Sequence, residues 1–302
     1  MVDKKSVSKN SNIENSNNID YIKWFSELRN KDIAVAGGKG ASLGEMFNNK
    51  FPVPPGYVIT AQAYDYYLKI SGLHEKIAQI ISILDVDDTV ALNEASRKIR
   101  NLIEDGTMPN DLREEILESY KILSGEDIDI GGINKDALSI LRNSKEPIFV
   151  SVRSSATTED LVDASFAGQQ ESFLNIKGYD KLIEFVKKCF SSLYTPRAIY
   201  YRNKKGFLEN QALLAVVVQK MIDSEKSGVV FSYDPISQTD LIVIEAVFGL
   251  GEGIVSGKIK PDSYRVSRDF TINNVQINNK KIAFVRTGSG QNEIVRLSPE
   301  KS

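Results

Sequence analysis

The chain has 302 residues, of which 41% are hydrophobic, so it contains enough apolar material for two lobes with buried cores. Lysine and arginine (38) nearly balance aspartate and glutamate (40), which leaves a net charge of −2. We therefore expect no nucleic acid and no membrane as a partner, because nucleic acids and anionic membranes bind proteins with concentrated positive charge. No apolar run is long enough to span a bilayer, and the N-terminus lacks the apolar core of a secretory signal, so a cytoplasmic protein is expected.

The two residue types most often used in catalysis and metal binding are almost absent. Cys189 is the single cysteine, which excludes an internal disulfide framework and a cysteine-based zinc site and predicts a packing role. His74 is the single histidine, and no acid or nucleophile stands near it at a suitable spacing, so it predicts a surface residue. A Ser-His-Asp or Cys-His mechanism is therefore not expected.

The first third of the chain predicts a leader, a glycine-rich turn and a helical subdomain. Residues 1–19 are almost entirely polar and predict a disordered leader. Residues 33–36 predict a short strand that leads through glycines into a helix, and Lys39 in this turn can hold an anion by its charge together with the helix dipole. The spacing fits neither a dinucleotide fingerprint nor a P-loop, so a purely structural turn is the alternative.

Beyond that turn, the pattern changes from extended to helical. Proline-rich residues 51–59 predict an extended lead into a strand, with Thr60 as the cap of the next helix. Between about residues 73 and 143, apolar residues recur every three or four positions, which predicts a helical subdomain.

The most informative stretch runs from residue 147 to residue 176. Apolar and polar residues alternate up to Arg153, which predicts a strand that carries Arg153 to its end, on the side opposite the valines. A loop then follows, where Gly168 allows close approach of the main chain to a ligand. Hydroxyl donors in this loop are Ser154, Ser155, Thr157 and Thr158. Together they predict a phosphate site, and the alternative is an exposed turn with an arginine salt bridge.

The last third predicts strands. Short β-branched segments at residues 212–221, 227–233 and 241–247 predict a mostly antiparallel sheet, and residues 263–267 and 281–286 predict further edge strands. The chain is thus predicted to be α+β, with two lobes that both carry glycine loops and basic residues, and such a layout favours a ligand in the cleft between them.

Seven motifs occur in one order along this chain. They are residues 36–46 (AGGKGASLGEM), 52–60 (PVPPGYVIT), 151–160 (SVRSSATTED), 164–170 (ASFAGQQ), 218–221 (VQKM), 227–231 (SGVVF), and 249–252 (GLGE) with 261–264 (PDSY). Over about residues 21–270, the chain closely resembles the N-terminal nucleotide-binding region of the phosphoenolpyruvate synthase and pyruvate phosphate dikinase family.

The resemblance implies an ATP-grasp fold with ATP clamped between two lobes, here residues 20–190 and an incomplete second lobe at 191–302. It implies Lys39 and Arg153 as phosphate-binding cations and the segment Ser154–Gly168 as the phosphate-covering loop. The remaining residues implied for ATP binding are Ser172, the adenine hinge Gln219, Lys220 and Met221, and Glu252 on the cleft wall.

The resemblance also implies a reaction. The terminal phosphates of ATP pass to a histidine on a mobile phosphocarrier domain, with release of AMP and phosphate, and the phosphohistidine then phosphorylates pyruvate on a pyruvate-binding domain. This chemistry requires charge neutralisation and positioning rather than a covalent nucleophile. Mg²⁺ is expected to bridge the phosphates.

The chain also departs from the family pattern. The family region continues into an acidic strand and a Gln-x-Arg strand that supply metal and phosphate contacts, so we expect the metal ligands beyond Ser302. No carrier-histidine motif is present, since His74 has other surroundings, and Val162 replaces a usual proline. We therefore expect the chain alone to be incompetent for the full reaction.

Other interpretations remain open from the sequence. Pyruvate phosphate dikinases and rifamycin phosphotransferases share a similar ATP domain, and the latter phosphorylate an antibiotic. Because the carrier histidine is absent, a non-catalytic nucleotide-binding module is a further alternative.

Overall fold

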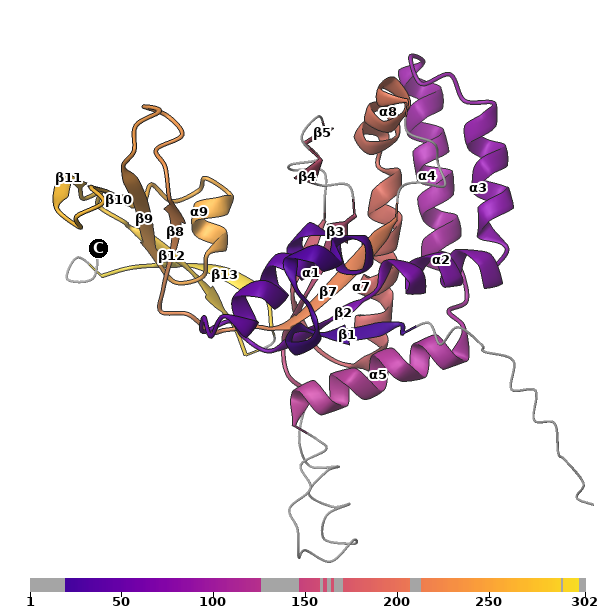
Figure 1. The fold of residues 1–302 in the computed structure, drawn as a ribbon, viewed down its shortest axis with the longest axis horizontal. Coiled ribbons are helices and arrows are strands. Elements are labelled where there is room, and N and C mark those ends of the chain that lie inside the picture. Colours follow the sequence, from indigo (N-terminus) through magenta and orange to yellow (C-terminus); the bar gives the residue numbers. More distant parts are fainter. Residues whose placement is uncertain are drawn as a thin grey trace, which may run out of the picture.

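The computed structural model describes residues 20–125, 147–157, 160–161, 164–165, 171–206, 213–288 and 290–298. They form two bodies, separated along the long axis in Figure 1: one combines a sheet with most of the helices, and the smaller one consists mainly of strands. This mixture of helices and antiparallel sheets confirms the predicted α+β class. The predicted leader, residues 1–19, lies outside the described residues.

The first body is built on a five-stranded sheet. In spatial order its strands are β1 (Ile22–Trp24), β2 (Gly56–Ile59), β7 (Leu214–Lys220), β3 (Val150–Ala156) and β6 (Ser172–Ile176). Strand β7 comes from the later part of the chain but lies at the centre of the sheet, where it pairs with β2 and β3. Its residues from Leu214 to Val218 are fully buried because both faces of the sheet are covered.

Helices cover one face of this sheet and pack on one another. They are α2 (Ala61–Ile70), α3 (Leu73–Ser82), α4 (Thr89–Asp105), α5 (Asn110–Ser124), α7 (Tyr179–Ser191) and α8 (Pro196–Lys205), with the 3-10 turn η3 (Ser192–Tyr194). Two other 3-10 turns, η1 (Phe25–Glu27) and η2 (Asn30–Asp32), pack against the helix on the opposite face of the sheet. The predicted helical subdomain is confirmed as far as Gly125, and residues 126–146 lie outside the described residues. The Thr60 cap is also confirmed, because its hydroxyl accepts the N–H of Ala63 at 3.2 Å.

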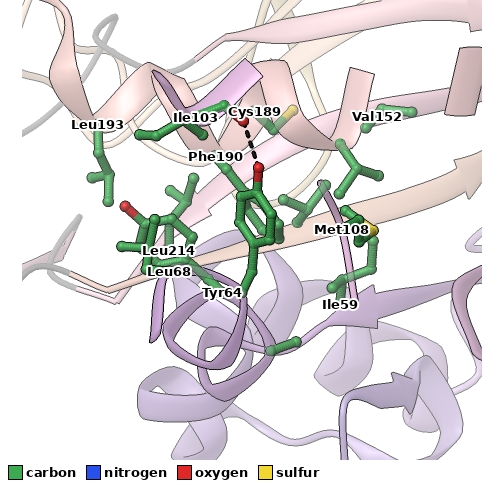
Figure 2. Packing of buried hydrophobic residues seen from close by; sticks show 14 of the residues in the cluster. Ile59, Tyr64, Leu68, Ile103, Met108, Val152, Cys189, Phe190, Leu193 and Leu214 are labelled. Carbon is green, nitrogen blue, oxygen red and sulfur yellow. Dashed lines mark hydrogen bonds between the residues drawn. The ribbon is translucent and has the colours of Figure 1, made fainter. Parts of the chain in front are cut away.

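The main core lies between these helices and the sheet. Figure 2 shows Tyr64 of α2, Phe190 of α7 and Leu214 of β7 in this packed cluster. Cys189 is fully buried there, and burial raises the pKa of its thiol, so its predicted packing role is confirmed. His74 is a surface residue, as predicted, but Asp65 lies 3.0 Å from its Nε2 atom, an acid that sequence spacing did not reveal.

The opposite face of the first sheet is covered by α1 (Ile33–Asn48). The predicted strand at residues 33–36 is wrong, since these residues are helical and the helix breaks at Gly37, where φ is 66°. A four-residue apolar run does not by itself distinguish a strand from a helix. Packing decides, because Ala36 forms a small second core with Val58 of β2 and Val217 of β7.

The second body carries a four-stranded sheet in the order β11 (Ile272–Gln276), β10 (Asp262–Val266), β9 (Ile242–Phe248) and β8 (Lys226–Phe231). The short helix α9 (Glu252–Val255) and the hairpin of β12 (Ile282–Arg286) and β13 (Asn292–Arg296) pack beside it. Two more short strands, β4 (Asp160–Leu161) and β5 (Ala164–Ser165), pair with each other.

Two predictions about this part of the chain need correction. Residues 212–247 do not form one sheet, because β7 joins the first body whereas β8 and β9 join the second. The division between the two sheets therefore falls between Lys220 and Lys226. Strand β10 is also interior and not an edge strand, since it pairs with both β9 and β11.

The described part of the chain lacks two features that would have suggested other functions. Within it, no helix is long and apolar enough to cross a membrane. Nor do the described residues include a group of three or more His, Cys, Asp or Glu side chains placed to hold a metal ion.

Candidate nucleotide site

A cavity of about 750 Å³ opens where the two bodies meet. The first body contributes residues of β3, β6 and β7 to its lining, and the second contributes α9 and the start of β13. Six of the residues predicted for ATP binding line this cavity: Arg153, Ser172, Gln219, Lys220, Met221 and Glu252. The fold thus brings together side chains from four separate segments of the sequence.

Arg153 reaches the cavity through the alternation of β3. Val150 and Val152 enter the main core, whereas Ser151 and Arg153 point to the opposite face of the sheet and line the cavity. The predicted orientation of Arg153 away from the valines is therefore confirmed. The predicted position of Arg153 at the strand end is wrong, since β3 continues to Ala156.

Strand register places two more predicted residues on the face of Arg153. Ser172 of β6 lies directly opposite Arg153, and Gln219 of β7 lies directly opposite Ser151. Directly paired residues of antiparallel strands share one face of a sheet. Arg153, Ser172 and Gln219 therefore form a polar strip on the face that α1 covers.

The predicted adenine hinge is held by backbone hydrogen bonds. The backbone N–H of Lys220 donates to the carbonyl of Pro55 at 3.0 Å, and the backbone N–H of Met221 donates to the carbonyl of Phe149 at 2.9 Å. The side-chain amide of Gln219 donates to the carbonyl of Pro54 at 3.1 Å. With these donors engaged, Lys220 and Met221 line the cavity, and Lys220 is also exposed to solvent.

Three of the predicted hydroxyl donors bond to main-chain carbonyls or are buried within the first body. Ser154 and Ser155 belong to β3 and not to a loop, and both are fully buried. The Ser154 hydroxyl donates to the carbonyl of Glu171 at 3.0 Å, and the Thr157 hydroxyl donates to the carbonyl of Leu213 at 3.1 Å. None of these three lines the cavity. Thr158 and Gly168 lie outside the described residues.

Lys39 follows the break in α1, on the helix that covers the face of Arg153. Its turn is fastened to β3 by Ser155, whose hydroxyl donates to the carbonyl of Ala36 at 2.8 Å and accepts the N–H of Gly40 at 3.2 Å. Lys39 is half-buried and is not among the cavity-lining residues. The fold therefore places its turn beside β3, with its side chain outside the cavity lining.

Sequence reasoning did not include three polar residues of the lining, Ser151, Ser224 and Asn292. Asn292 of β13 lines the cavity and donates from its amide to the carboxylate of Glu252. No motif surrounds Asn292, and only the folding of the β12–β13 hairpin against the cavity brings it there. No local signal in the sequence could therefore have found it.

A larger cavity, of about 1050 Å³, lies between α3, α4 and the segment after α4. Its lining includes Ile80, Leu84 and Leu102 and none of the residues predicted for ATP binding. Size alone therefore does not single out the smaller cavity, which differs from the larger one in that the predicted polar side chains converge on it.

Comparisons with known proteins identify the family of this chain. A family model described as "Pyruvate phosphate dikinase, AMP/ATP-binding domain" matches residues 33–302. The chain is 49% identical to a probable phosphoenolpyruvate synthase of Methanocaldococcus jannaschii over 92% of its length, and 41% identical to the phosphoenolpyruvate synthase of Pyrococcus furiosus over 89%. It covers 22% and 36% of these two relatives, so it spans about a third of their length or less. The chain therefore belongs to the AMP/ATP-binding domain family of pyruvate phosphate dikinase and phosphoenolpyruvate synthase.

Proposed function

We propose that this chain binds MgATP in the 750 Å³ cavity and serves as the nucleotide-binding part of a phosphoenolpyruvate synthase with an ATP-grasp fold. The volume lies within the range of small-ligand pockets, roughly 300–1,000 Å³. The convergence of Arg153, Ser172, Gln219 and Glu252 on one cavity carries the proposal. The named relatives favour the synthase over an antibiotic phosphotransferase or a non-catalytic module.

In this function the chain supplies positioning and charge, not a covalent nucleophile. The guanidinium of Arg153 offers a planar set of donors that suits phosphate oxygens, and Lys220 adds a second cation to the lining. The phosphoryl group passes to a histidine of a phosphocarrier domain and then to pyruvate, outside this chain. Orienting the terminal phosphates toward that domain is the contribution of the cavity.

The residues present fit a nucleotide-bound Mg²⁺ in part. Glu252 is the one carboxylate among the described residues that line the cavity. Magnesium at nucleotide sites takes one or two carboxylates together with phosphate oxygens, so Glu252 would be the protein ligand here. The ion would neutralise phosphate charge when bound.

Calorimetric titration with MgATP tests the proposal. Replacing Arg153 by alanine should weaken binding about tenfold or more, because a charge-assisted hydrogen bond to phosphate is lost. Arg197 of α8 is exposed and does not line the cavity, so Arg197→Ala is the matched control and should leave the affinity unchanged. AMP should compete with ATP for the same site. Equal affinity of the Arg153→Ala variant and the unsubstituted protein would defeat the assignment.

A further inference from the structure

Three polar side chains form a continuous bridge between the two bodies. The side-chain amide of Asn175 in β6 donates to Oδ1 of Asn292 in β13 at 2.5 Å. The amide of Asn292 in turn donates to Oε2 of Glu252 in α9. Asn292 and Glu252 both line the nucleotide cavity, so the bridge runs along its wall.

The backbone around Asn175 is shaped to present this side chain. Val150 pairs with Ile176 and Val152 pairs with Phe173, so two residues of β6 lie opposite the one residue Ser151 of β3. This two-against-one arrangement is a β-bulge, which re-aims side chains and occurs often beside functional sites. Asn175 has φ of 56°, a left-handed conformation that asparagine tolerates better than most residues, and its side chain is buried.

The hairpin that carries Asn292 is also fastened to the first body at other points. The guanidinium of Arg286 lies 4.6 Å from the centre of the Phe149 ring, just before β3, and pairs with Asp223 at 3.3 Å. Gly290 lies so close to Phe149 that a Cβ atom there would come within 2.4 Å of the ring. Figure 1 shows β13 reaching from the second body toward the first.

We propose that Asn292 is a positioning residue that fixes the Glu252 carboxylate in the cavity and, through Asn175, sets the spacing of the two bodies. A carboxylate held by an amide donor keeps one rotamer, so less entropy is lost when it meets a ligand. The Asn292–Asn175 contact joins elements of different bodies, so the width of the cavity depends on it. The identity of the ligand that Glu252 meets rests on the proposed function. The spacing of the two bodies does not depend on it.

The spacing can be measured without nucleotide. Cys189 is buried and unreactive, so spin labels can be attached at Ser82→Cys on α3 and Asn274→Cys on β11, both exposed positions. We expect one narrow distance distribution for this labelled protein and a broader or longer one after Asn292→Ala or Asn175→Asp. Asn175→Asp keeps the side-chain shape and the tolerance for positive φ but removes the donor to Asn292. The control is Gln291→Ala, at the exposed neighbour of Asn292, which should change nothing.

The positioning of Glu252 is tested by MgATP calorimetry in two backgrounds. Asn292→Ala should weaken binding roughly tenfold in the otherwise unsubstituted protein, the loss expected for a hydrogen bond to a charged group. In a Glu252→Ala background the same change should cost clearly less, because the carboxylate it positions is gone. Gln291→Ala should cost nothing in either background.

Each outcome decides a separate point. Equal losses in both backgrounds would overturn the positioning of Glu252 by Asn292. Unchanged distance distributions in the Asn292→Ala and Asn175→Asp variants would overturn the bridge. Absence of MgATP binding by the unsubstituted protein would instead refute the proposed function, and the distance measurements would still decide the bridge.

Discussion

Replacement of Gly37 by alanine should destabilise this protein more than replacement of any freely exposed glycine. Gly37 has φ of 66° and ψ of 172°, a backbone region that is essentially restricted to glycine and costs another residue about 1–3 kcal/mol. A Cβ atom at this position would also lie 2.2 Å from the carbonyl oxygen of Ser155 and 2.3 Å from its hydroxyl. Both contacts are far inside van der Waals distance, so α1 must move away from β3.

The size of the effect follows from these two contributions. Overpacking of a tight interior costs about 1–3 kcal/mol, and the movement also breaks the Ser155 hydrogen bonds to Ala36 and Gly40. We therefore expect a loss of about 3–5 kcal/mol in the free energy of unfolding. Gly72 supplies the control, because its φ is 61° and a Cβ atom there would have no neighbour within 4 Å. Gly72→Ala should cost only about 1 kcal/mol.

Urea unfolding followed by far-ultraviolet circular dichroism measures both variants, with the slope of the transition checked for two-state behaviour. A Gly37→Ala variant as stable as the Gly72→Ala variant would refute the reasoning. It would mean that α1 and β3 separate without loss, and that the turn carrying Lys39 is not held by close packing on β3.

Two further predictions concern single hydrogen-bonded groups. Tyr67→Phe should lower the free energy of unfolding by about 1–3 kcal/mol in the same urea assay, because the buried Tyr67 hydroxyl donates to the carbonyl of Ile103 at 2.6 Å. An effect near zero would show that this hydrogen bond adds nothing to stability. Asp234 has a lowered pKa, owing first to its hydrogen bond with the Ser237 side chain, then to the backbone N–H of Ile236, with Arg265 also contributing. Because the folded pKa lies below the unfolded value of about 3.9, this stabilisation is present above that pH and is lost as the pH falls below it. Unfolding measured from pH 6 down to pH 2 should therefore show a steeper acid loss in the unsubstituted protein than in Asp234→Asn, and parallel curves would contradict the prediction.

Much of the fold could be predicted because local patterns carry it. The three-and-four spacing of apolar residues predicted the helices around Ile77 and Ile99, and Thr60 indicated the start of α2 by its capping chemistry. The pattern at residues 33–36 was too short to distinguish a strand from a helix. These residues are helical because Ala36 packs on β2 and β7.

The family, the α+β class and the side of β3 on which Arg153 lies could be predicted before the fold was known, because motif spacing and strand alternation are local properties. Which strands share a sheet could not be predicted, since the pairing of β7 with β2 and β3 depends on contacts between distant segments. The same holds for the cavity. Ser154 and Ser155 do not line it, because they are buried in β3, where their hydroxyls bond to main-chain carbonyls. Asn292 lines it because a hairpin that carries no motif folds against Phe149 and Asn175.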